Sequence, residues 1–107
     1  MHIEPTIVFP VVYVLKLMDD KYYVGITSNF NYRYSQHLQG CGAKWTRMYR
    51  PIEIISVCVG DEDKENELTL EMMKLHGWKN VRGGSWCRID LKTNPLDKIT
   101  IDDIDDA

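Results

Sequence analysis

The sequence predicts a small α/β domain in which a three-stranded antiparallel sheet, made of a β-hairpin and a third strand, is flanked by helices. Two short runs rich in β-branched and aromatic residues, at 11–17 and 21–26, flank residues with turn chemistry and indicate the hairpin. A third strand-like run lies at 52–59. Apolar residues recur at helical spacing over 29–39 and 63–76, so we expect two helices to pack on the sheet.

Length and composition are those of one soluble globular domain. The chain has 107 residues, of which 44% are hydrophobic and 27% charged, which allows one modest core. We expect residues 1–90 to form a single domain. Residues 91–107 alternate acids with isoleucines and are expected to form an acidic tail that is partly docked or disordered.

Cysteine usage and hydropathy predict an intracellular protein. No apolar run approaches the roughly 20 residues that span a bilayer, and the N-terminus lacks the basic region of a signal peptide. Three cysteines without paired spacing indicate reduced thiols rather than disulfides or a zinc site.

Charge is distributed unevenly along the chain. Residues 1–60 carry six bases and four acids, whereas 61–107 carry seven bases and twelve acids. Every charge between Asp20 and Glu53 is positive, so this window can attract a polyanion locally. The alternative is an ordinary solvated surface.

The hairpin also suggests a phosphate site. Tyr13 and Tyr23 occupy facing positions of the two strands, and Arg33 lies early in the helix expected to cross that face. Two phenols and a guanidinium on one surface can bind phosphate. His37 lies one helical turn beyond Arg33 and reaches the same region. Alternatively, the tyrosines are cross-strand packing partners, Arg33 pairs with an acid on the second helix, and His37 is a helix-surface residue.

A second set of candidate residues lies in the segment 40–51, which we expect to be a loop. Its bases interleave with aromatic rings, as in surfaces that grip a nucleic-acid strand. The candidate DNA-binding residues are Lys44, Trp45, Arg47 and Arg50. The alternative is that Trp45 fills the core while the bases are solvated.

The two tyrosine tripeptides resemble those that give the GIY-YIG nuclease family its name. They read Val-Val-Tyr at 11–13 and Tyr-Val-Gly at 23–25, with the first Gly and the Ile of the family pattern replaced. Arg33, eight residues after Gly25, and His37 also fit the family. The segment 80–85 resembles small stand-alone members from large DNA viruses and phages.

This resemblance implies a DNA endonuclease that hydrolyses phosphodiester bonds with one divalent ion, Mg²⁺ or Mn²⁺. By the same resemblance, Tyr13 is the base or orients it, and Tyr23 contacts the phosphate or the water around the ion. Arg33 would clamp the phosphate, and His37 would shuttle a proton.

The metal ligand is where this sequence departs from the family. The position of the family's glutamate falls on Thr69. Glu65 lies one helical turn earlier on the same stripe and is therefore the expected metal carboxylate, with Thr69 near the ion's water, whereas Glu67 and Glu71 point elsewhere. Alternatively, Thr69 is a tolerated small core residue and Glu65 an acid that favours the helix N-terminus.

Three functions stay open on the sequence. The first is a metal-dependent endonuclease acting on double-stranded or branched DNA. The second is a catalytically silent DNA-binding or adaptor module on the same fold. The third is an unrelated α/β domain that binds proteins. Metal-dependent nicking of a plasmid separates the first from the second, and a salt-dependent gel shift separates the second from the third.

Overall fold

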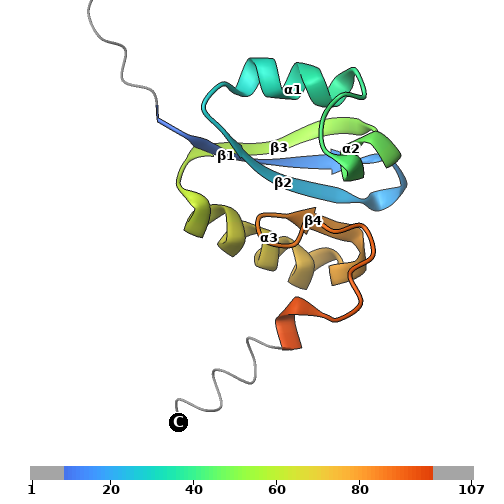
Figure 1. The fold of residues 1–107 in the computed structure, drawn as a ribbon. Coiled ribbons are helices and arrows are strands. Elements are labelled where there is room, and N and C mark those ends of the chain that lie inside the picture. The colour runs from blue at the N-terminus through green and yellow to red at the C-terminus, as the bar shows by residue number, and fades with distance from the viewer. Residues whose placement is uncertain (1–8, 98–107) are drawn as a thin grey trace, which may run out of the picture.

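A computed structural model describes residues 9–97 and shows a four-stranded sheet with helices on both faces (Figure 1). The strands follow the order β3-β1-β2-β4 across the sheet. Their bounds are β1 (Val11–Leu17), β2 (Tyr22–Thr27), β3 (Pro51–Val59) and β4 (Val81–Gly83). The α-helices are α1 (Phe30–Leu38), α2 (Lys44–Met48) and α3 (Glu62–His76), with short 3₁₀ turns η1 (Met18–Asp20) and η2 (Trp78–Asn80).

The α/β class is confirmed, but the prediction of three antiparallel strands is wrong. The sheet is mixed, because β1 pairs antiparallel with both β2 and β3 whereas β4 pairs parallel with β2. The fourth strand has only three residues, one of them Gly83, so it carries no alternating pattern that marks a strand. The third strand, β3, forms the opposite edge of the sheet.

The hairpin of β1 and β2 is confirmed. Asp19 and Asp20 form the turn with positive φ angles of 61° and 56°, a conformation that Asp adopts more readily than most residues. Tyr13 pairs with Gly25 and Tyr23 with Leu15, so the two tyrosines are diagonal neighbours on one face of the sheet rather than directly opposite.

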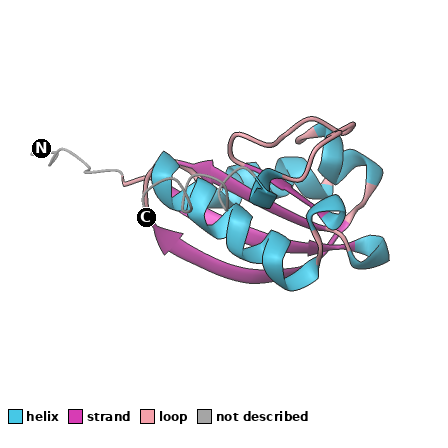
Figure 2. Cartoon of the chain, turned by 90° about the horizontal axis from the view of Figure 1, so that it is seen from below, coloured by secondary structure: helices cyan, strands magenta, loops and turns pink. Residues whose placement is uncertain are grey.

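Alternation along the strands builds a separate apolar cluster on each face. Val12, Val14 and Val24 pack with Met72 and Met73 of α3. On the opposite face, Tyr13, Leu15, Leu17 and Tyr23 pack with Trp45 of α2, and α1 and α2 lie on that side (Figure 1). Figure 2 shows α3 covering the sheet from the other side. The two tyrosines of the candidate site therefore lie beneath α1.

The two long helices begin and end close to the predicted positions. Asn29 caps α1 by accepting a hydrogen bond from the Tyr32 amide, and Asp61 caps α3 by accepting one from the Lys64 amide. Gly77 ends α3. The prediction that residues 40–51 form a loop is wrong in part, because this segment contains the five-residue helix α2.

Arg82 organises the segment that follows α3. Its side chain is only 4% exposed, and the guanidinium lies 4.5 Å from the centre of the Trp45 ring. It donates hydrogen bonds to backbone carbonyl groups before, within and after β4, at Trp78, Lys79, Val81, Arg88 and Ile89. Burial lowers the pKa of Arg82. This one side chain therefore joins η2 to the segment beyond β4.

The predicted acidic tail begins inside the described residues and continues beyond them. Leu91 and Leu96 pack against the cluster on the α3 face. The remainder of the tail, 98–107, lies outside the described residues. Within the part of the chain that the structure describes, no helix is both long and apolar enough to cross a membrane.

Replacing Arg82 with lysine should lower the free energy of unfolding. Lysine keeps the charge but lacks the planar fork that reaches several carbonyl groups at once. We expect a loss on the order of 3 kcal/mol, measured by urea denaturation. Arg88→Lys is the matched control, since the Arg88 side chain is largely exposed, and it should change stability by less than about 0.5 kcal/mol. Equal losses in the two variants would contradict this role.

Candidate active site

The two tyrosines and the first long helix meet as the hairpin predicts. The ring centres of Tyr13 and Tyr23 are 6.2 Å apart, and each ring also contacts His37 from α1, with ring centres 5.8 Å and 5.3 Å away. A side chain at Gly25, which pairs with Tyr13, would collide with the Tyr13 hydroxyl. The shared face of Tyr13 and Tyr23 is therefore confirmed.

His37 is the most deeply buried polar residue at this site. Its side chain is fully buried, and both ring nitrogens have hydrogen-bond partners. Nε2 lies 2.8 Å from the Tyr13 hydroxyl, and Nδ1 lies 2.8 Å from the hydroxyl of Thr46. The Thr46 hydroxyl in turn donates to the Ala43 carbonyl at 2.9 Å. The alternative in which His37 is a helix-surface residue is therefore wrong.

Arg33 is the half-exposed cation of the site. Its guanidinium donates a hydrogen bond of 3.0 Å to Gln36, one turn along α1. Arg33 also lies close enough to Tyr13 to lower the pKa of its phenol. Among residues 9–97 no carboxylate lies within ion-pair distance of Arg33, so the alternative of a pair with an acid on α3 is not what the described residues show. A half-exposed guanidinium without a paired carboxylate is available to an anion.

Burial keeps the aromatic groups of the site uncharged. It raises the pKa of Tyr13 to about 12, although Arg33 opposes the rise, and it also raises the pKa of Tyr23. Burial lowers the pKa of His37 to about 4, helped by the positive charge of Arg33. At neutral pH the tyrosines are therefore phenols and His37 is a neutral imidazole.

The position at which the resemblance to the GIY-YIG family puts a glutamate is filled by a buried threonine. Thr69 is fully buried, and its hydroxyl donates to the Glu65 carbonyl at 2.7 Å. It lies beneath β4, because a side chain at Gly83 would come within 2.9 Å of the Thr69 hydroxyl and would collide with the Val24 carbonyl. The expectation that Thr69 contacts water around an ion does not fit this burial.

Glu65 faces the site from one helical turn earlier. It is partly exposed, and a backbone hydrogen bond joins its carboxylate to Gly84, just past the end of β4. Burial raises the pKa of Glu65, an effect that the Gly84 hydrogen bond opposes and the nearby Glu62 reinforces. Its charge also raises the pKa of Tyr13 and Tyr23, which places the carboxylate near both phenols.

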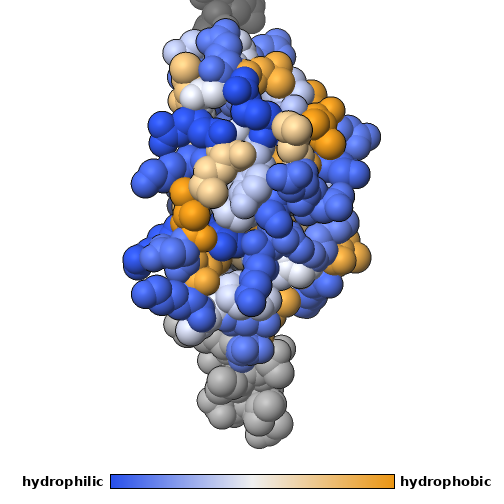
Figure 3. Space-filling model, turned by 90° about the vertical axis from the view of Figure 1, so that its right-hand side faces the viewer, coloured by the Kyte–Doolittle hydropathy of each residue, from blue (hydrophilic) through white to orange (hydrophobic). Residues whose placement is uncertain are grey.

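Of the four residues predicted for DNA binding, the three bases lie on the surface and Trp45 lies in the core. Lys44 and Arg47 of α2 and the following Arg50 are exposed, and the Arg50 guanidinium donates to the Leu38 carbonyl at the end of α1. Trp45 is only 4% exposed, and its indole nitrogen donates to the Tyr22 carbonyl at 3.0 Å, so its expected role in stacking on bases is corrected: it fills the core. The face on the side of α2 is largely hydrophilic (Figure 3).

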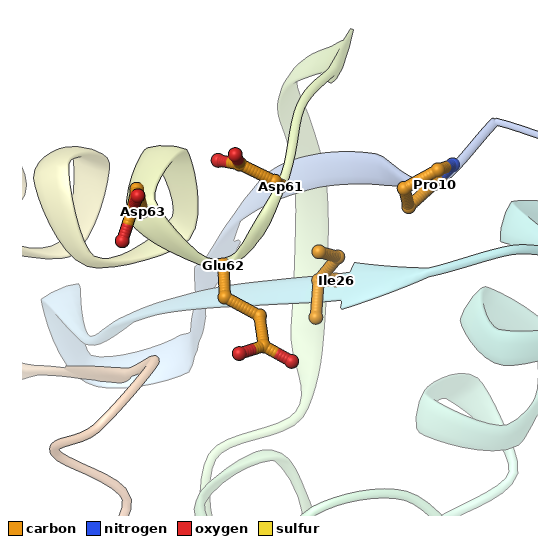
Figure 4. Close-up of a pocket in the computed structure, with 5 residues that line it drawn as sticks. All are labelled: Pro10, Ile26, Asp61, Glu62 and Asp63. Carbon is orange, nitrogen blue, oxygen red and sulfur yellow. The ribbon is translucent and has the colours of Figure 1, made fainter.

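An acidic pocket lies at the start of α3. It has a volume of about 420 Å³ and is lined by Asp61, Glu62 and Asp63 together with Pro10 and Ile26 (Figure 4). Three neighbouring carboxylates repel a polyanion. This pocket is therefore unfavourable for a polyanion.

At the candidate site, the described residues offer a divalent ion a single carboxylate, that of Glu65, rather than a complete set of protein ligands. No group of three or more His, Cys, Asp or Glu side chains within residues 9–97 could hold a metal ion. Mg²⁺ keeps several of its waters and commonly binds proteins through one or two carboxylates plus substrate phosphate. Glu65, with phenol oxygens nearby, is a donor set of hard oxygen atoms that fits such an ion.

The family model for the GIY-YIG catalytic domain matches residues 9–79, which include both tyrosines, Arg33, His37 and Glu65. The chain therefore belongs to the GIY-YIG family. The matching region ends before β4, so the strand that covers Thr69 lies outside it.

Curated relatives are UPF0213 proteins from bacteria. The chain is 35% identical over 66 residues to one from Photorhabdus laumondii, covering 61% of this chain and 64% of that protein. It is 43% identical over 44 residues to one from Clostridium perfringens, covering 41% of this chain and 47% of that protein. The UPF0213 protein YazA of Bacillus subtilis is 42% identical over 43 residues, or 40% of this chain and 43% of YazA. The matches thus span about half the length of these relatives, and no solved structure matches the chain.

Sequence reasoning did not find two residues of the site, Thr46 and Gly42. Thr46 makes the second hydrogen bond of His37, and a side chain at Gly42 would collide with the His37 ring. Neither residue carries a charge or belongs to an amphipathic pattern. The one signal was the pair of glycines directly after the first helix, which indicates that backbone approaches another group closely.

The burial of neutral His37 predicts a pH-dependent stability. The unfolded chain protonates His37 near its ordinary pKa of 6.5, whereas the folded protein does so only near 4. The stability contributed by neutral His37 is therefore complete above about pH 6.5 and is lost as the pH falls toward 4, a change on the order of 3 kcal/mol. The measurement is urea denaturation of the unmodified protein and His37→Gln between pH 4 and 7. The difference in unfolding free energy between the two should shrink as the pH falls; parallel curves would contradict the burial of neutral His37.

Proposed function

We propose that this protein is a DNA endonuclease that hydrolyses a phosphodiester bond with one divalent ion, Mg²⁺ or Mn²⁺. The observation that supports this most directly is the convergence on the Tyr13 hydroxyl: Nε2 of His37 lies 2.8 Å from it, and the charges of Arg33 and Glu65 both act on it. Membership of a family defined by its catalytic domain supports the same reaction.

In this proposal, Tyr13 and His37 together remove the proton from the attacking water. A phenol with a pKa of about 12 is a poor base by itself at neutral pH, because its oxygen already holds a proton. As the water oxygen attacks phosphorus, the water proton passes to the Tyr13 oxygen and the phenol proton passes to Nε2 of His37. The ester bond to the leaving oxygen then breaks, and solvent returns a proton to that oxygen.

Arg33 and Tyr23 would bind the phosphate, and Glu65 would hold the ion. A guanidinium stabilises the charge that grows on the non-bridging oxygens as the water attacks. When bound, a divalent ion acts as a Lewis acid on the phosphate and assists the leaving oxygen. The charge of Glu65 acts on both phenols, which supports its place beside them.

The proposed substrate is double-stranded or branched DNA. Lys44, Arg47 and Arg50 are the exposed bases beside α1 and α2 that would contact the phosphates flanking the cleaved bond. The three cysteines at 41, 58 and 87 are free thiols, which supports a reducing, intracellular compartment.

One observation favours a second candidate, a DNA-binding module that does not cut. Thr69 leaves the position of the family's glutamate without a carboxylate. If Glu65 does not replace that carboxylate, the protein binds DNA through its basic surface and cleaves nothing with any metal. Plasmid nicking and gel-shift measurements on the same preparation separate these two functions.

Arg33→Ala should nearly abolish cleavage and leave the fold intact. Removing one donor to a transition-state phosphate costs roughly 3–4 kcal/mol, or a hundredfold to a thousandfold in rate. The measurement is magnesium-dependent plasmid nicking together with the melting temperature. Arg88→Ala is the control, because Arg88 is exposed and lies outside the site. A sharply lower melting temperature with intact specific activity would make Arg33 a structural residue.

Glu65→Gln should remove metal-dependent cleavage while DNA binding persists in a gel shift. Glu71→Gln is the matched control on the same helix, since Glu71 is exposed, and it should cleave normally. Thr69→Glu should not rescue Glu65→Gln, because position 69 is fully buried beneath β4 and has no room for a longer charged side chain. Full activity in Glu65→Gln would place the metal ligand elsewhere.

A further inference from the structure

The imidazole of His37 is held by a hydrogen-bond chain that runs from β1 to α2. The chain connects the Tyr13 hydroxyl to Nε2, Nδ1 to the Thr46 hydroxyl, and that hydroxyl to the Ala43 carbonyl, at 2.8, 2.8 and 2.9 Å. His37 and Thr46 are both fully buried. Which group donates and which accepts in each of these hydrogen bonds therefore depends on where the protons of His37, Tyr13 and Thr46 lie.

The direction follows from counting protons. The Thr46 hydroxyl has one proton, and it lies toward the Ala43 carbonyl, because two oxygens 2.9 Å apart repel each other unless a proton lies between them. Thr46 then presents only lone pairs to His37. Nδ1 must carry the proton of the neutral ring, and Nε2 is left as an acceptor.

The opposite tautomer would leave a buried proton without an acceptor. If Nε2 carried the proton, it would donate to the Tyr13 oxygen, which also interacts with the donor Arg33. Tyr13 is only 1% exposed, and its hydroxyl would then have no acceptor for its own proton. With the proton on Nδ1, the Tyr13 hydroxyl donates to His37 and its oxygen keeps lone pairs for the nearby Arg33 charge, so each buried proton of the chain has an acceptor.

We propose that Thr46 is a positioning residue that holds His37 in the tautomer with the proton on Nδ1, so that Nε2 is free to accept the proton of Tyr13. This inference rests on the proposed nuclease function for its catalytic consequence, but the tautomer itself does not depend on it. Thr46 does not touch the reacting atoms; it acts through His37.

Gly42 makes this role specific to Thr46. A side chain at residue 42 would collide with Nδ1, so the backbone of the segment between α1 and α2 covers that edge of the ring. The ring is fully buried, and the space beside Nδ1 is already filled. With an isosteric apolar group in place of the Thr46 hydroxyl, a water molecule has no room to replace it.

The test compares Thr46→Val, which keeps the shape and removes the acceptor, with Thr46→Ser, which keeps the hydroxyl. The ¹⁵N shifts of the His37 ring at neutral pH report which nitrogen carries the proton. We expect Nδ1 to be protonated in the unmodified protein and in Thr46→Ser. In Thr46→Val the Nδ1 proton loses its acceptor, while Tyr13 still favours an unprotonated Nε2, so we expect the Nε2–H tautomer to become populated at the expense of Nδ1–H. Cleavage by Thr46→Val should then fall roughly tenfold to a hundredfold in kcat with KM unchanged, and Thr46→Ser should restore it.

Each outcome decides the proposal. A proton on Nε2 in the unmodified protein overturns it without any variant, as does an Nε2–H population in Thr46→Val that is no larger than in the unmodified protein. If the unmodified protein cleaves no DNA, the proposed function fails, and the ¹⁵N comparison still decides whether Thr46 sets the tautomer. If the tautomer changes as expected while kcat does not, Thr46 sets the ring but does not position it for the reaction, and the proposal is overturned.

Discussion

The close approach of β4 to β2 and α3 is the constraint on which the rest of the site depends. Gly83 lies against the Val24 carbonyl and the Thr69 hydroxyl, and no larger residue fits between them. Position 69 is therefore closed by backbone, which explains physically why it holds a small residue that satisfies its own hydroxyl on the Glu65 carbonyl. Beyond Gly84 the strand has ended, and the carboxylate of Glu65 lies near the phenols instead.

The site has a buried part and a half-exposed part with different tasks. Tyr13 and His37 are almost fully buried and uncharged, and their hydrogen bonds fix where protons lie. Arg33 and Glu65 carry the charges and remain partly open to solvent, where an anion and a cation can reach them. Burial thus supplies a neutral proton acceptor, while the half-exposed groups keep charges that full burial would suppress.

How much of this could be predicted from the sequence depends on how local each signal is. The hairpin, the shared face of Tyr13 and Tyr23, and the helix cap at Asn29 follow from patterns within a few residues, and the structure agrees. The strand β4 has only three residues and is held by its pairing with β2, which is distant in sequence. It is therefore too short to show the alternating pattern that predicts a strand. Thr46 could not be found either, because its role depends on a histidine nine residues away.

The most direct test of this account is a crystal structure of the protein grown with a short DNA duplex and Mn²⁺, with the ion placed by its anomalous scattering. The account predicts one ion bound by the Glu65 carboxylate, on the side of Tyr13 and Tyr23, with a DNA phosphate against Arg33. An ion held by other carboxylates, or DNA bound with Glu65 turned away from both the ion and the phosphate, would contradict it.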